Sequence, residues 1–230
     1  MENENILIMK DLDVRLFTDR GELPVIDRLS LTLKAGETLG IVGESGCGKS
    51  MLASAIMGLV AHPGKVTGGS IQFEGQELVG MKKKDLRRIR GTGISMIFQE
   101  PMTSLNPVYT IGQQLIEALL LHEKMTKQEA KARAIEMLKL VKIPLAERRF
   151  DEYPHQLSGG MRQRVMIAMA LCCNPAMLIC DEPTTALDVT IQAQILDLIN
   201  ELKEKTGTSV MMITHDLGVI AEVADDVMVM

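Results

Sequence analysis

The sequence of 230 residues contains no tryptophan, and only 3% of its residues are aromatic. A chain so poor in aromatic side chains offers few surfaces on which nucleic-acid bases could stack. Its net charge of −5 at pH 7 likewise gives the chain as a whole no attraction for nucleic acid or anionic lipid. Hydrophobic residues make up 46% of the chain and include 17 methionines, which excludes a disordered chain and predicts an aliphatic, thioether-rich core.

The sequence also lacks a long hydrophobic run. Its longest apolar candidate, Val165 to Cys173, is less than half of the ~20 residues that a membrane-spanning helix needs. Residues Met1 to Glu4 have neither the basic start nor the apolar run of a signal peptide. We therefore expect a soluble chain, which would serve a membrane only as a peripheral subunit.

Cysteine is scarce, and the four cysteines form no CxxC pair. Zinc sites commonly use such pairs, so zinc is not expected. Cys172 and Cys173 are adjacent, Cys180 lies in an apolar run, and Cys47 lies in a glycine-rich loop. The pattern is typical of reduced, buried thiols in a cytosolic protein.

The sequence does contain a regular alternation of short apolar strands and helices. Two β-prone stretches, Ile6–Phe17 and Val25–Leu33, flank the turn signal Asp19–Glu22 and predict a hairpin. Thr126 and Glu129 form a capping box, which marks a helix start. Further strands are expected at 38–43, 70–73, 94–98, 176–180, 209–213 and 227–230, and helices at 49–60, 82–90, 111–123, 126–142, 159–173, 189–205 and 217–224.

This order predicts an α/β fold with a mostly parallel sheet that helices cover on both faces. The N-terminal hairpin adds an antiparallel subdomain, and residues 101–158, which have little strand signal, indicate an inserted all-helical subdomain. We expect one domain over residues 1–230, in which residues 1–100 and 159–230 form the α/β core together with its β subdomain.

Residues 43–50, GESGCGKS, match the phosphate-binding pattern GxxxxGK[ST] in full, between an expected strand and an expected helix. Glycines let backbone N–H groups turn toward phosphate oxygens, and the helix N-terminus adds positive potential. Lys49 is expected to bridge the β- and γ-phosphates and Ser50 to bind Mg²⁺. A chance glycine-rich turn is the alternative, which the flanking elements disfavour. The residues expected to hold the nucleotide are Gly43, Glu44, Ser45, Gly46, Cys47, Gly48, Lys49, Ser50 and Met51.

An apolar strand, residues 177–180, ends in two carboxylates, Asp181 and Glu182. Sites in parallel sheets gather at strand ends. Asp181 is therefore expected to hold Mg²⁺, directly or through water, and Glu182 to polarise the attacking water as a general base. The alternative is an ordinary acidic turn before Pro183, which the pair alone would favour. After a phosphate-binding loop, the pair instead indicates a P-loop ATPase.

A glycine-rich stretch, Leu157–Met161, opens an expected helix before the acidic strand. It resembles the LSGGQ signature of ABC ATPases, with Met161 where glutamine is usual. Gln99, the segment Ala186–Asp188 and His215 resemble the Q-loop, the D-loop and the switch histidine of that family, in the family's order. The resemblance covers essentially the whole chain.

A closer resemblance lies in residues 98–107, FQEPMTSLNP, and in the SGGM form of the signature. Both are similar to the ATP-binding subunits of dipeptide and oligopeptide importers, of which the nickel importers are close relatives. The subfamily implies ATP and Mg²⁺ as cofactors and an energy-coupling role in import, most directly of di- or oligopeptides, alternatively of nickel or another small solute.

The resemblance also implies that two ATPase subunits sandwich two nucleotides. Ser158, Gly159 and Gly160 would reach the nucleotide held by the partner's P-loop, with Asp188 at the seam. Within its own subunit, Gln99 would contact Mg²⁺ or the attacking water. His215 would contact the γ-phosphate and that water.

Two further roles follow from the resemblance. The family stacks an aromatic residue on adenine, and Phe17 is the only aromatic residue before Lys49; its alternative is core packing at a strand end. The insertion would dock a membrane subunit through the apolar loop residues Leu105, Pro107, Val108 and Tyr109, whose alternative is packing inside the insertion.

The implied partners are a second, identical or sister ATPase subunit, transmembrane permease subunits and, indirectly, an extracytoplasmic solute-binding protein. The implied location is the cytoplasmic face of the cell membrane, without nucleic acid. An ABC ATPase acting on nucleic acid or ribosomes would favour tandem ATPase domains, a coiled-coil insertion or a strong basic face. A nucleotide-binding module without turnover is disfavoured by Glu182 and His215.

Two features lie outside these roles. The run Lys82–Arg90 has six basic residues in nine, which could touch nucleic acid or lipid headgroups but more simply forms a solvated helix face. The chain ends at Met230 inside an expected strand. We expect the natural chain to continue, because subunits of peptide importers carry a C-terminal extension, often with clustered cysteines.

Overall fold

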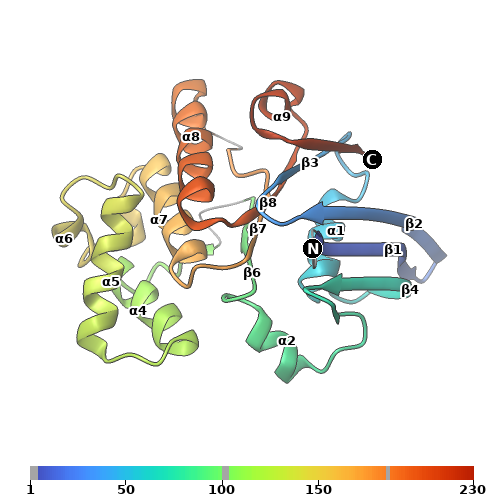
Figure 1. The fold of residues 1–230 in the computed structure, drawn as a ribbon, viewed down its shortest axis with the longest axis horizontal. Helices are drawn as coiled ribbons and strands as arrows, with labels where there is room; N and C mark the ends of the chain where they lie inside the picture. The colour runs from blue at the N-terminus through green and yellow to red at the C-terminus, as the bar shows by residue number, and fades with distance from the viewer. Residues whose placement is uncertain (1–4, 100–103, 185–186) are drawn as a thin grey trace.

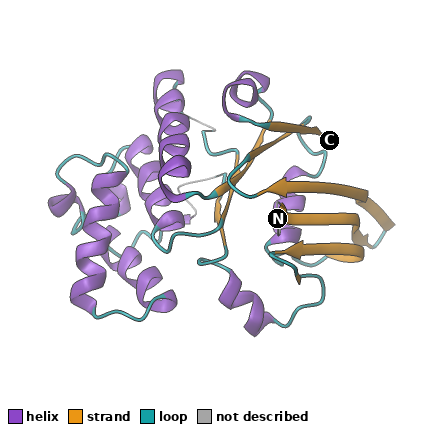
Figure 2. Cartoon of the chain, viewed as in Figure 1, coloured by secondary structure: helices purple, strands orange, loops and turns teal. Residues whose placement is uncertain are grey.

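The structure is a computed structural model, and it describes residues 5–99, 104–184 and 187–230. Two sheets lie beside a group of helices (Figure 1), and Figure 2 separates the strand-rich part of the molecule from the helical part. Within the described residues, no helix is both long enough and apolar enough to cross a membrane.

The first sheet is antiparallel and contains the predicted hairpin. Its strands are ordered β2-β1-β4-β5, with bounds β1 (Asn5–Thr18), β2 (Gly21–Lys34), β4 (Gly64–Phe73) and β5 (Gln76–Glu77). The hairpin prediction is confirmed, because Thr18 pairs with Gly21 across the turn.

Strand β4 begins six residues before the strand predicted at 70–73. Gly68 and Gly69 lie inside the strand, where Gly68 pairs with Asp13 next to a register shift. Gly69 has φ +85°, and a Cβ there would lie 2.4 Å from the Asp11 carbonyl oxygen. The absence of a side chain at Gly69 therefore allows β4 to lie close to the backbone of β1 at this irregularity of the sheet.

The second sheet is parallel, and this confirms the predicted α/β fold class. Its order is β6-β7-β8-β3-β9. The bounds are β6 (Ile94–Ile97), β7 (Met177–Asp181), β8 (Ser209–Thr214), β3 (Thr38–Val42) and β9 (Asp226–Val229). Because parallel strands end at the same edge, the segments after β3, β6, β7 and β8 meet along one line.

The helices lie close to their predicted ranges. Their bounds are α1 (Lys49–Ile56), α2 (Lys83–Ile89), α4 (Ile111–His122), α5 (Lys127–Leu140), α6 (Ala146–Arg149), α7 (Gly159–Leu171), α8 (Val189–Thr206) and α9 (Leu217–Val223). The capping box is confirmed, since the Thr126 side chain accepts from Glu129 N–H and Glu129 accepts from Thr126 N–H at 2.7 Å. Helix α1 ends before the predicted Val60, because Gly58 turns the chain at φ +60°.

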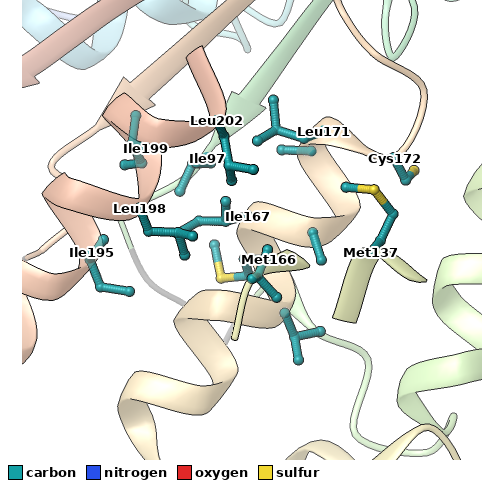
Figure 3. Packing of buried hydrophobic residues seen from close by; sticks show 14 of the residues in the cluster. Ile97, Met137, Met166, Ile167, Leu171, Cys172, Ile195, Leu198, Ile199 and Leu202 are labelled. Carbon is teal, nitrogen blue, oxygen red and sulfur yellow. The ribbon is translucent and has the colours of Figure 1, made fainter. Parts of the chain in front are cut away.

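Side chains of the parallel sheet alternate between two hydrophobic clusters. Leu178 and Cys180 of β7 face one cluster, whereas Met177 and Ile179 face the other. The first cluster joins the sheet to α4, α5, α7 and α8. Figure 3 shows part of this cluster, including Leu198 of α8 and Ile167 of α7. The second joins the sheet to α1 and the antiparallel sheet. Both faces are therefore covered, as predicted.

Helices α4 to α6 occupy the stretch predicted as a helical insertion. Its first boundary, Pro101, lies outside the described residues, so the division at 101–158 stays a prediction. Cys172, Cys173 and Cys180 are buried as expected, whereas Cys47 is partly exposed.

Candidate functional site

The loop between β3 and α1 has the shape that its glycines require. Gly46 and Gly48 have φ +86° and +103°, and a Cβ on Gly48 would lie 3.0 Å from the Val25 carbonyl oxygen of β2. A side chain at Gly48 would be strained as well as crowded. The loop therefore turns tightly against β2, and helix α1 begins directly after this turn.

Lys49 is the charged centre of this loop. It is the first residue of α1 and only 5% exposed, and its Nζ donates to the carbonyl oxygens of Gly43 at 2.8 Å and Glu44 at 2.9 Å. No described carboxylate lies within ion-pair distance of it, although it interacts electrostatically with Asp181. The ammonium lies at a helix N-terminus, where unpaired N–H groups add to the field. This donor set fits the phosphates of a nucleotide.

A cavity of about 270 Å³ opens beside this ammonium. It is lined by Val25, Ser45, Gly46, Gly48, Lys49, Ser50, Met51, Gln99 and Glu182. Several predicted nucleotide-binding residues therefore share one cavity with two of the predicted catalytic residues.

Ser50 and Asp181 form the pair predicted to hold Mg²⁺. The Ser50 hydroxyl lies 3.1 Å from Asp181 Oδ1, although the two residues are 131 positions apart. Over the described residues there is no group of three His, Cys, Asp or Glu that could hold a metal alone. A hydroxyl and one carboxylate suit Mg²⁺, which takes few protein ligands and keeps water and phosphate oxygens. The residues present therefore fit this ion.

Burial raises the pKa of the Asp181 carboxyl, while its hydrogen bond from Ser50 acts in the opposite direction. A carboxyl whose pKa is higher in the folded chain than in the unfolded chain lowers stability at every pH above that folded pKa. The charged Asp181 carboxylate therefore lowers the free energy of unfolding, as is common for groups that bind a ligand.

We expect Asp181→Asn to raise the unfolding temperature of the ligand-free chain at neutral pH, because the amide keeps an acceptor for Ser50 and removes the buried charge. The same variant should lose the stabilisation by Mg·ATP, which for an intact site reaches about 2.7 kcal/mol at 100 times Kd. Thermal unfolding with and without Mg·ATP measures both effects. Asp197→Asn, an exposed position on α8, is the control. A lower unfolding temperature for ligand-free Asp181→Asn would contradict this account.

Three predicted catalytic residues converge at the end of β7. Gln99 Nε2 donates to Glu182 Oε2 at 2.8 Å, and His215 Nδ1 lies 3.2 Å from Glu182 Oε1. Glu182 itself has φ +46°, a left-handed conformation that non-glycine residues rarely adopt. Its N–H is held by the Ile213 carbonyl oxygen at 2.9 Å. Strain of this kind persists where the surroundings fix it, and it concentrates at functional sites.

The signature residues lie in a different cavity. Ser158 caps α7, with its hydroxyl accepting from the Met161 N–H at 3.3 Å, and Asp188 caps α8, accepting from the Ile191 N–H at 3.0 Å. Both line a cavity of about 390 Å³, together with Gly159, Gly160, Met161, Arg164, Leu187 and Ile191. No described residue lines both this cavity and the one beside Lys49.

Phe17 lies at the end of β1 and is 39% exposed. It is not among the described residues that line the cavity beside Lys49, so its adenine role stays a prediction. Val25 lines that cavity instead, and sequence reasoning missed it. A single valine in a β-prone run carries no signal of this kind, because only the packing of β2 against the loop brings it there.

Gln163 was also missed. It lies on α7, is 1% exposed, and its Nε2 donates to the carbonyl oxygen of Pro183, the residue after Glu182. Helix α7 begins at the signature, so this buried amide joins the signature helix to the segment that carries Glu182. Its sequence neighbours are Arg162 and Arg164, so a glutamine at this position gave no signal of burial.

The prediction of a docking loop is wrong for Leu105. Leu105 is 3% exposed and belongs to the hydrophobic cluster around α4 and α7, because its side chain packs inward. Val108 and Tyr109 are 71% and 49% exposed, and Pro107 is also exposed. The neighbouring residues Glu100, Met102 and Thr103, and Ala186 of the predicted D-loop, lie outside the described residues.

The chain is similar to proteins of a known family: a family model described as ABC transporter matches residues 26–185. The chain is 58% identical over 98% of its length to the oligopeptide transport ATP-binding protein OppD of Haemophilus influenzae, and 55% identical over 98% to OppD of Escherichia coli. It is 54% identical over 98% to the dipeptide transport ATP-binding protein DppD of Haemophilus influenzae. The chain covers 69%, 66% and 68% of these three relatives.

Solved structures share the fold. The ATP-binding cassette MJ0796, a dimer in a post-hydrolysis state with ADP and Pi, superposes with a TM-score of 0.86 at 30% identity, covering 97% of this chain and 94% of that one. CbiO1 of Clostridium perfringens, part of the transporter complex cbiONQ, gives a TM-score of 0.82 at 28% identity, covering 99% of this chain and 85% of that one.

Proposed function

Since the chain belongs to the ABC transporter family and is an ATPase that uses ATP with Mg²⁺, we propose that it powers a membrane importer of dipeptides or oligopeptides. The observation that carries the proposal is the identity of more than half of its residues, along almost its whole length, to ATP-binding proteins of oligopeptide and dipeptide transport. The convergence of Gln99 and His215 on Glu182 supports the hydrolytic part.

We assign the chemistry to residues at the edge of the parallel sheet. Glu182 accepts a proton from the attacking water, and the hydrogen-bond donors Gln99 and His215 hold its two oxygens in place. Lys49 and the first N–H groups of α1 bind the phosphates. Ser50 and Asp181 would hold Mg²⁺, which when bound neutralises charge on the phosphate oxygens.

The active form would be a dimer. In each subunit the signature cavity, with Ser158 and Asp188, is separate from the cavity beside Lys49, so neither completes the other within one chain. In a head-to-tail pair, the N-terminus of α7 from one subunit would face the phosphates held by the partner. The dimeric state of MJ0796 supports this arrangement.

The other proposed partners are membrane subunits, a solute-binding protein and the second ATPase subunit. Transmembrane permease subunits would dock on the exposed loop residues Pro107, Val108 and Tyr109, which present apolar surface next to α4. The chain would then lie at the cytoplasmic face of the membrane. An extracytoplasmic solute-binding protein would deliver the peptide on the other side, and the partner ATPase would be a second copy or a sister subunit.

Uptake by cells tests the transport role. Removing the chain from its natural host should abolish ATP-dependent uptake of a labelled tripeptide, and a copy of the wild-type sequence should restore it. A Glu182→Gln copy should not restore it. Loss of labelled nickel uptake with peptide uptake intact, or recovery of the purified chain with nucleic acid and without a permease, would contradict the proposal.

A further inference from the structure

A strongly basic surface on α2 is not used by the catalytic site. We define this basic surface as Lys82, Lys83, Lys84, Arg87 and Arg88, all of which are exposed. The run from Lys82 to Arg90 contains six basic residues and one acidic residue, a net charge of +5 in a chain of net charge −5. Six of the 25 lysines and arginines therefore lie in this one short segment, and the rest of the chain has a net negative charge.

The charges on this surface are mostly left uncompensated. Arg88 lies 3.8 Å from Asp85, but Lys82, Lys83, Lys84 and Arg87 form no ion pair with any residue that the structure describes. Some other exposed cations do find partners: Lys142, Lys139 and Lys205 pair with Glu201, Glu147 and Glu201 at 2.5 to 2.7 Å. A helix face that serves only solubility usually mixes both signs evenly, whereas this one carries a single acidic residue, Asp85.

The helix that carries these charges is fixed in place. Arg90 donates from Nε to the Met57 carbonyl oxygen at 2.8 Å and from Nη2 to the Gly58 carbonyl oxygen at 2.9 Å. Leu86 is 8% exposed and lies against Gly58, where an added Cβ would be 2.9 Å from its Cδ1. The buried face of α2 thus anchors it, and the lysines and arginines project from a rigid support.

A second element completes the surface. A cavity of about 610 Å³ lies between α2 and the end of α4, lined by Arg87, Arg88, Arg90, Thr92, Leu121 and His122. Leu121 is 75% exposed. Arg90 already donates to Met57 and Gly58, but the Arg87 guanidinium has no ion-pair partner among the described residues and can bind phosphate oxygens in a two-pronged geometry. An exposed aliphatic side chain among cations is typical of segments that lie in the headgroup layer of a membrane.

We propose that the basic surface and this cavity bind the headgroups of anionic phospholipids, so that α2 and the end of α4 face the bilayer. The inference rests on the proposed function for placing the chain at a membrane, and it names a contact with lipid in addition to that with the permease. Charge complementarity favours a membrane over RNA, because Leu121 matches acyl chains and the basic surface includes no aromatic residue for stacking on bases.

Vesicle co-sedimentation of the purified chain tests this contact. Wild type should bind vesicles of phosphatidylglycerol mixed with phosphatidylcholine, bind phosphatidylcholine vesicles weakly, and leave the anionic vesicles when salt is raised to about 0.5 M. The triple variant Lys82→Gln, Lys83→Gln, Lys84→Gln should bind the anionic vesicles about 10²-fold less, at roughly fivefold for each lysine. Its ATP hydrolysis in solution should equal that of wild type.

The matched control is Lys10→Gln, Lys65→Gln, Lys127→Gln, which removes three exposed lysines from other elements. It should bind vesicles as wild type does. The proposal is overturned if the two triple variants bind equally, if wild type does not distinguish the two lipids, or if a single-stranded RNA oligonucleotide binds more tightly than the anionic vesicles at the same salt. Failure of the transport role would instead appear as unchanged peptide uptake in cells that lack the chain, a separate measurement.

Discussion

Replacing Glu182 with glutamine is expected to lower the rate of ATP hydrolysis about 10²–10⁴-fold, the usual effect of losing a general base. Glutamine has almost the same size and can still accept hydrogen bonds through its amide oxygen, so the cavity beside Lys49 should keep its shape. ATP should therefore bind as it does in wild type. Phosphate release at saturating ATP measures the first effect, and calorimetric titration with ATP and Mg²⁺ measures the second.

Glu222→Gln is the matched control, because it makes the same chemical change at an exposed position on α9. It should leave both measurements unchanged. Glu182→Gln hydrolysing ATP within about tenfold of wild type would remove Glu182 from the role of base. Loss of ATP binding in this variant would show that the carboxylate shapes the nucleotide cavity instead.

Gly159→Asp is expected to abolish hydrolysis, by at least about 10²-fold, without unfolding the chain. A Cβ at Gly159 would meet only Leu187 Cδ2, at 4.0 Å, so an aspartate fits within its own subunit. A carboxylate in the first turn of α7 is even favourable for the isolated helix. In a head-to-tail dimer, however, the same carboxylate would face the partner's phosphates and repel them.

The discriminating result is that Gly159→Asp still binds ATP at its own P-loop while it fails to form the ATP-dependent dimer. Light scattering with Mg·ATP, on a Glu182→Gln background that prevents turnover, measures the dimer. Gln128→Asp adds the same charge to the first turn of α5 and should dimerise normally. Normal dimerisation of Gly159→Asp would mean that the signature does not contact a partner's nucleotide.

The local parts of the site could be predicted from the sequence because each is encoded within a few residues. The phosphate-binding loop needs its glycines and Lys49 in one short run, and the pattern of apolar strands then places Asp181 and Glu182 at the same sheet edge. The meeting of Gln99 and His215 with Glu182 is different. These partners lie 83 and 33 residues away in the sequence, so only resemblance to a family, and not spacing, indicated them.

What could not be predicted depends on packing between distant segments. The strand predicted at 70–73 in fact begins at Gly64, because residues 64–68 pair with the neighbouring strand β1. Leu105 was expected to dock a partner because an apolar group in a loop needs a surface to bury against, but it packs into the hydrophobic cluster with α4 and α7, the alternative that the sequence left open. Val25 reaches the cavity beside Lys49 only because β2 packs against the loop that carries Gly48. In each case the partner that decides the outcome is remote in the chain.

The hydrogen bond from Gln163 to Pro183 has a thermodynamic consequence for the proposed dimer. Each subunit would contribute its Glu182 to one composite site and its signature to the other, and this bond joins the two contributions through buried atoms. Moving α7 away from the segment after Glu182 would leave the buried Gln163 Nε2 without its acceptor, at a cost of about 1–3 kcal/mol. The two nucleotides would therefore be linked: occupancy of one site biases the affinity of the other, and by reciprocity each does so by the same factor. We would then expect the dimer to bind its two ATP molecules cooperatively.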